Sequence, residues 1–99
     1  MKQDKEPRAM FAIGGDDWPG LAKVAEECSE VTTIVSKLMG TGGNPDYWDG
    51  QDLRQRLIDE LGDAVAAIEF ATHYNGILDE VMDRAKKKLE LFESWRNNR

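Results

Sequence analysis

Apolar residues recur every three or four positions along three long segments of the chain, a spacing that lines one face of a helix. The first segment runs from Trp18 to Gly40, and its apolar positions are Leu21, Val24, Ala25, Cys28, Val31, Val35, Leu38 and Met39. The second, from Asp49 to about Tyr74, carries Leu53, Leu57, Leu61, Ala64, Val65, Ile68 and Thr72. The third, from about Ile77 to Trp95, carries Leu78, Val81, Met82, Ala85, Leu89 and Phe92. We expect these main stripes to face the core. No strand pattern of any length occurs, so the sequence predicts an all-α fold, a helical bundle of three long helices.

The chain divides into an N-terminal arm, residues 1–17, and an all-α domain, residues 18–99. A short apolar run at residues 9–13 is followed by two glycines, which break it. We expect this part to form either an arm or a short N-terminal helix that packs on the body.

Polar and special residues predict where the long helices begin and end. Asp16 and Asp17 precede Pro19, and an Asp cap followed by an early proline is typical of a helix start. Gly40 is expected to end the first long helix as a left-handed cap residue. Asp49 is expected to cap the second.

Composition narrows the class of protein. The chain has 99 residues, 40% hydrophobic and 32% charged, as expected of one small globular domain. Its formal charge of −6 argues against general binding of nucleic acid or anionic membranes. A single cysteine, Cys28, excludes an internal disulfide, and no apolar run approaches the ~20 residues that span a bilayer. We expect a cytoplasmic protein.

An acidic pattern occurs twice, at an offset of 33 residues: Glu26 coincides with Asp59, Glu27 with Glu60, Glu30 with Asp63, and Lys23 with Arg56. Helical geometry places Glu27 and Glu30 on one flank of their helix, and Glu60 and Asp63 on the equivalent flank of the next. Four such carboxylates can converge on one point. Oxygen-only ligation suits Mg²⁺, with Mn²⁺ as a substitute.

A second apolar row continues from the acids on each helix. These rows, which we call the acid-side seams, are Ile34 and Leu38 on the first helix and Ala67, Phe70 and Tyr74 on the second. We expect them to face another helix or subunit, or to line a pocket. Acidic pairs at helical spacing are also common on solvated faces, where they only solubilise the helix. The matching register and the seams favour a site.

These residues resemble the signature of the MazG-like, all-α nucleoside triphosphate pyrophosphohydrolases. The resemblance covers about residues 18–95. It includes three sequence segments, one before the first motif, one after it and one near the end of the chain: Trp18-Pro19-Gly20-Leu21-Ala22-Lys23, Lys37-Leu38-Met39-Gly40 and Lys88-Leu89-Glu90-Leu91-Phe92-Glu93. One departure is the 29 residues between Glu30 and Glu60, at or just beyond the family's usual upper limit.

The resemblance implies a Mg²⁺-dependent enzyme that cleaves a nucleoside triphosphate to the monophosphate and pyrophosphate, as in house-cleaning of the nucleotide pool. It implies metal ligation by Glu27, Glu30, Glu60 and Asp63, with Glu26 as the acid that orients or deprotonates the attacking water. It also implies assembly as a homodimer or a dimer of dimers.

Other residues are candidates for substrate binding. Lys23 belongs to the sequence segment before the first motif. Arg84 and Lys88 form an i, i+4 pair, which can contact a triphosphate or simply complement the helix dipole. Tyr47 and Trp48 can stack on a base or anchor their loop to the core, and we favour the anchor.

Two alternatives stay open at this point. One is a dUTPase-like or phosphoribosyl-ATP-cleaving enzyme on the same fold. The other is a non-catalytic helical interaction module, in which the seams bind a partner and the acids only solubilise the chain.

Overall fold

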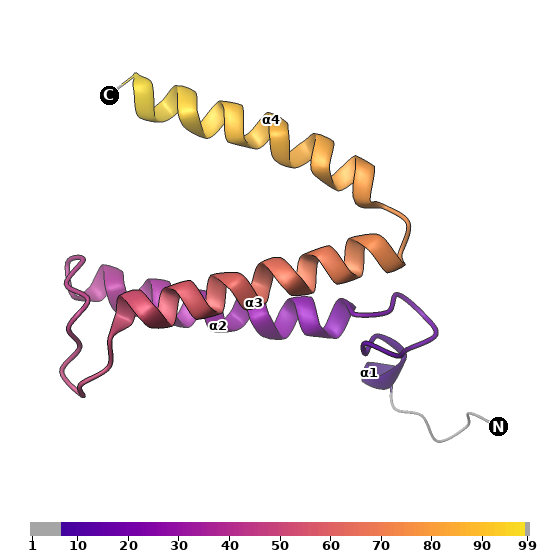
Figure 1. The fold of residues 1–99 in the computed structure, drawn as a ribbon, viewed down its shortest axis with the longest axis horizontal. Coiled ribbons are helices and arrows are strands. Elements are labelled where there is room, and N and C mark those ends of the chain that lie inside the picture. The colour runs from indigo at the N-terminus through magenta and orange to yellow at the C-terminus, as the bar shows by residue number, and fades with distance from the viewer. Residues whose placement is uncertain (1–6, 99) are drawn as a thin grey trace.

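The computed structural model describes residues 7–98, which contain helices and loops but no strand. The helices are α1 (Pro7–Met10), α2 (Leu21–Gly40), α3 (Leu53–Tyr74) and α4 (Leu78–Asn97) (Figure 1). The all-α prediction and the three long helices are confirmed. Of the predicted arm, residues 1–6 lie outside the described residues, and the rest contains the short helix α1. None of the described helices is long and apolar enough to cross a membrane.

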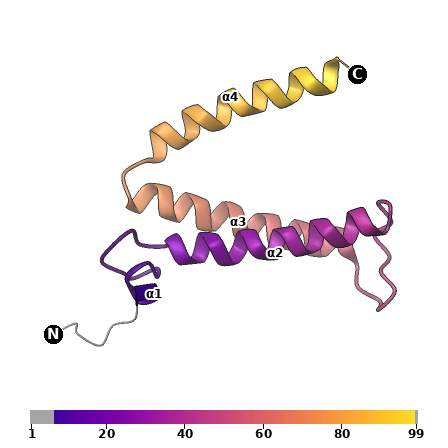
Figure 2. The same ribbon diagram turned by 180° about the vertical axis from the view of Figure 1, so that it is seen from behind.

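Helices α2 and α3 pack side by side and antiparallel, as both views show (Figures 1 and 2). The buried apolar side chains are Ile34 on α2 and Leu53, Ala64, Ala67 and Ala71 on α3. The three alanines recur at a spacing of three and four residues, so they form one small-residue face of α3. Because the distance between packed helices depends on side-chain size at the contact, this face lets α2 approach closely.

The faces used for this contact differ in part from the predicted ones. On α2 the contact follows the acid-side seam, since Ile34 is buried while Val35 and Met39 of the main stripe are exposed, Met39 by 76%. On α3 the buried residues come from both rows: Ala67 belongs to the seam, whereas Leu53, Ala64 and Thr72 belong to the main stripe, of which Val65 is 54% exposed. Cys28, at the middle of its main stripe, is also exposed, so its assignment to the core was wrong. A pair of helices can bury only one face of each partner, and the alanine face permits the closer approach.

Helix α4 turns away from the α2–α3 pair after a tight turn at Asn75 and Gly76 (Figure 1). Only Val81 of its predicted inward residues is half-buried, and the others are exposed: Leu78, Met82, Ala85, Leu89 and Phe92. The radius of gyration is 17.1 Å, against about 13 Å for a compact chain of this length. Within one chain, the predicted inward face of α4 is therefore not buried.

The three predicted caps were also wrong. The N-cap of α2 is Gly20, in the left-handed region, and the arm supplies carbonyl acceptors to this end: Gly20 N–H donates to Ala12 and Ala22 N–H donates to Phe11. The cap of α3 is Asp52, whose carboxylate accepts from the Gln55 N–H at 3.2 Å. Helix α2 ends at Gly40 as predicted, but Gly40 is not in the left-handed region and the C-cap is Thr41.

Gly20 fixes how the start of α2 meets the end of α3. Its φ is +82°, and a Cβ there would lie 2.6 Å from Cδ1 of Phe70. The neighbouring Pro19 carbonyl accepts a hydrogen bond from Asn75 Nδ2 at 3.0 Å. Both contacts join segments far apart in the sequence, so this corner sets the relative position of the two helices.

We expect Gly20→Ala to lower the free energy of unfolding by about 1–3 kcal/mol, because the new methyl group meets Phe70 and the backbone conformation disfavours a side chain. Gly14→Ala is the matched control, since a Cβ at Gly14 meets nothing within 4 Å. Urea unfolding of both variants measures the difference. Equal stability of the two variants would contradict the role given to Gly20.

Candidate metal centre

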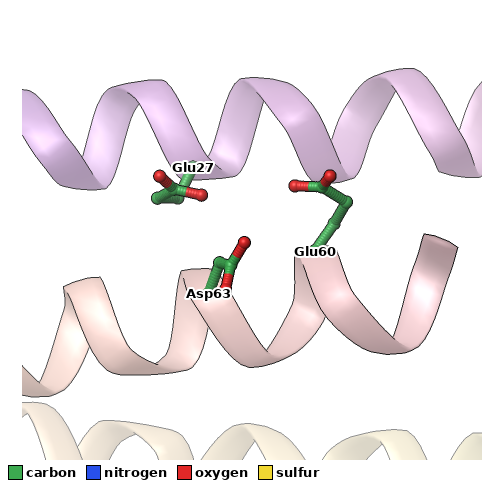
Figure 3. Close-up of side chains that lie close together, drawn as sticks. All are labelled: Glu27, Glu60 and Asp63. Carbon is green, nitrogen blue, oxygen red and sulfur yellow. The ribbon is translucent and has the colours of Figure 1, made fainter.

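Three carboxylates meet where α2 and α3 pack. Glu27 comes from α2, and Glu60 and Asp63 come from one face of α3; one oxygen of each lies within 4.8 Å of the other two. Figure 3 shows the three side chains pointing toward one another in the space between the helices. Glu27 and Glu60 are half-buried, and Asp63 is exposed. The antiparallel packing brings the two halves of the acidic repeat together, as the register match predicted.

Basic side chains lie next to these acids. Arg56 Nη2 is 3.4 Å from Glu60 Oε1, and Arg56 Nη1 donates to Gln51 Oε1, also at 3.4 Å. Lys23 Nζ donates to Glu26 Oε2 at 3.0 Å. The hydrogen bond and charge of Glu26 raise the pKa of the Lys23 ammonium. Each acidic motif therefore has a cation one helical turn before it.

Glu27 has the electrostatics of a crowded carboxylate. Burial raises its pKa most, and the negative charges of Asp63, Glu26 and Glu60 raise it further, against the opposing effect of Lys23. Desolvation and like charges both penalise the ionised form. A cation bound among the three carboxylates would reverse this penalty, and hard oxygen donors of this kind fit Mg²⁺ or Mn²⁺.

Two of the predicted acids lie outside the group of three. Glu30 is exposed on α2, one turn beyond Glu27, and Glu26 is exposed and bound to Lys23. The structure thus brings together three of the four predicted ligands. The i, i+3 spacing placed Glu30 on the correct flank, but the contact with α3 covers only Glu27.

The remaining predicted residues lie on α4 and in the loop before α3. Within the described part of the chain, no ion pair joins Arg84 or Lys88 to an acid, and Lys88 Nζ lies 5.9 Å from the Phe92 ring centroid. Tyr47 is half-buried with Lys37 Nζ 5.3 Å from its ring centroid, whereas Trp48 is 86% exposed. Tyr47 therefore anchors the loop, and the Trp48 ring is accessible for stacking.

Arg56 is a residue that the sequence interpretation did not assign to the site. Its signal was in the repeat itself, because Arg56 stands four residues before Glu60 just as Lys23 stands four before Glu27. That spacing places a side chain on the same helix face as the acid.

Comparisons of the chain with protein-family models, with curated protein sequences and with solved structures found no match. The resemblance to MazG-like enzymes rests on the motif residues, and the family assignment stays a prediction.

We expect Glu27→Gln to raise the melting temperature in EDTA at pH 7 by a few degrees. The raised pKa of Glu27 means that folding favours its neutral form. Its stabilising contribution is full below the ordinary value of 4.5 and is lost as the pH rises through the raised pKa. The amide stays neutral, so the variant avoids this loss. Thermal unfolding between pH 4 and pH 8 measures it.

Glu69→Gln is the control for this prediction, since it changes the net charge equally on an exposed position of α3 outside the group of three. An equal rise in melting temperature in the control would show that only the overall charge matters.

Proposed function

We propose that the protein is a Mg²⁺-dependent nucleoside triphosphate pyrophosphohydrolase, which cleaves the α–β anhydride to release a nucleoside monophosphate and pyrophosphate. One observation carries the proposal. Glu27, Glu60 and Asp63, three positions at which the MazG-like motif implies metal ligands, converge within 4.8 Å although 32 residues separate Glu27 from Glu60.

In this proposal the three carboxylates bind the metal, and Glu26 accepts the proton of the attacking water. When bound, the metal lowers the pKa of a coordinated water and neutralises charge on the phosphates. Glu26 is exposed and adjacent to Glu27 on α2, so its carboxylate can be reached by water. Lys23 orients it through the 3.0 Å hydrogen bond. Mn²⁺ is the expected substitute for Mg²⁺.

The charge of the chain favours a metal-bound form of the substrate. A net charge of −6 repels a free triphosphate, whereas a cation among the acids reverses the local sign. Lys23, Arg84 and Lys88 are the proposed phosphate contacts. Trp48, with Tyr47 holding its loop, is the proposed stacking surface for the base.

The proposal includes self-association as a homodimer or a dimer of dimers. The main stripes of α2 and α3 and the apolar face of α4 expose Val35, Met39, Val65, Met82 and Phe92 in one chain. Among the residues that the structure describes, Ile34 and Leu53 alone are large side chains with complete burial. A chain with so small a core gains stability when a second copy covers these faces. Arg84 and Lys88, which lie apart from the acids within one chain, would reach them from a partner.

The same exposed faces support a second candidate from another class, the helical interaction module. The two functions differ in their response to metal: Mg²⁺ or Mn²⁺ should raise the melting temperature of the enzyme, whereas a module whose acids only solubilise it shows no rise. Within the enzyme class, a dUTPase-like or phosphoribosyl-ATP-cleaving activity is separated by a panel of substrates.

We expect Glu60→Gln to reduce pyrophosphate release by roughly 100-fold or more, because losing a metal ligand costs more than losing an outer partner of one. The assay is a screen of the common ribo- and deoxyribonucleoside triphosphates with Mg²⁺. Glu80→Gln, at an exposed acid of α4, is the control. Retained activity in Glu60→Gln, with the helical circular dichroism unchanged, would remove Glu60 from the site.

We expect Val65→Asp to weaken self-association by roughly 100-fold or more, since it buries an unpaired charge at the proposed interface. Size-exclusion chromatography with light scattering over a range of concentrations measures the change. Thr33→Asp, an exposed polar position on α2, is the control. A wild-type chain that stays monomeric at all concentrations would contradict the assembly.

A further inference from the structure

We infer that Arg56 is an exchangeable cation of the site: it pairs with Glu60 when no metal is bound and turns to a phosphate oxygen of a linear polyphosphate when a metal takes Glu60. This inference rests on the proposed function, and it places Arg56 beside the phosphates of the proposed substrate. It assigns to Arg56 a role in binding and none in the chemical step.

The contacts of Arg56 are loose. Its distances to Glu60 and Gln51 are both 3.4 Å, longer than the 2.7–2.9 Å of a strong charge-assisted hydrogen bond. The Arg56 side chain is 41% exposed, whereas that of Glu60 is only 13% exposed. The guanidinium is thus accessible from solvent while its acid is covered. With five N–H groups in a planar fork, it retains donors for a phosphate after these two contacts.

The position of Arg56 complements that of Lys23. Each cation precedes its acid by four residues, about one helical turn or ~5.4 Å along the axis. Because α2 and α3 are antiparallel, these turns lead in opposite directions from the acids (Figures 1 and 2). Lys23 therefore lies toward the α1 end, and Arg56 lies toward the loop before α3. A cation at each end of an acidic centre suits a metal ion in the middle and an extended anion along the row.

A single phosphate or carboxylate is too short to contact the cations at both ends of the acidic group. An extended di- or triphosphate carries negative charge along its length, and a metal ion bound to it satisfies the acids at the centre. The chain's net charge of −6 disfavours binding of such an anion away from these cations. The arrangement therefore favours a metal-complexed polyphosphate over a small monoanion.

In this inference, a metal ion and Arg56 compete for the Glu60 carboxylate. The simpler interpretation is that the Arg56–Glu60 pair only stabilises its helix. An i, i+4 Arg–Glu pair that only supports its helix contributes little and affects no ligand. If Arg56 exchanges, its removal has effects of opposite sign: the metal meets less competition, and the polyphosphate loses a partner.

The test is isothermal titration of the full chain with two probes. The first probe is Mg²⁺ or Mn²⁺ alone, added to metal-free protein. The second is inorganic pyrophosphate, added at saturating metal. We expect Arg56→Gln to bind the metal about 2- to 5-fold more tightly, the worth of one partly exposed ion pair. We expect it to bind pyrophosphate about 10-fold more weakly, the worth of a charged hydrogen bond.

Two further variants control the experiment. Arg54→Gln removes the same charge from an exposed position of α3 and should leave both affinities near the wild-type values. Arg56→Lys keeps the charge and loses the fork, so it should preserve metal affinity and give intermediate pyrophosphate affinity.

The outcomes of the titrations distinguish failure of the Arg56 inference from failure of the proposed function. Metal binding by the wild type with both affinities unchanged in Arg56→Gln, or both weakened, overturns the exchange and leaves the proposed function standing. Equal effects of Arg54→Gln and Arg56→Gln overturn it as well, because they would reflect only net charge. No binding of Mg²⁺ or Mn²⁺ by the wild type overturns both the inference and the proposed function.

Discussion

The close contact of α2 with the alanine face of α3 is the constraint on which the site depends. Ala64, Ala67 and Ala71 are buried there together with Ile34. Small side chains let the two helices approach, and the carboxylates of Glu27 and Asp63 come into range only because they do. A bulkier residue at Ala64, one position after Asp63, would widen the contact at the level of the acids. The apolar packing and the acidic centre are therefore parts of one interface.

The contact carries an electrostatic cost at its own centre. Glu27 is partly desolvated beside Asp63 and Glu60, and its raised pKa reports that penalty. Arg56 and Lys23 offset part of the negative charge from the two sides. A divalent cation would offset more of it. We therefore expect the stability of the α2–α3 contact to depend on the cations beside these acids.

Helix periodicity predicted the elements well and their packing less well. Gly40 and Tyr74 were correct as helix ends, because a change from a periodic pattern to glycine and polar residues is a local signal. The choice between Ile34 and Val35 as the buried face was not local. Both lie on apolar faces of α2, and only the alanines of the partner helix decide which one packs. The caps failed for a related reason, since the backbone carbonyls of the arm replace an Asp side chain at the start of α2.

The convergence of three acids was more predictable than the packing, and the repeat explains why. A matching register needs only that the two motifs sit at the same height on neighbouring helices, which Glu27, Glu60 and Asp63 do. The repeat did not predict whether the two helices run parallel or antiparallel. Parallel helices would have put Lys23 and Arg56 at the same end of the acids, whereas antiparallel helices put one cation at each end. The direction of packing, more than the identity of the acids, therefore separates the two cations along the acidic group.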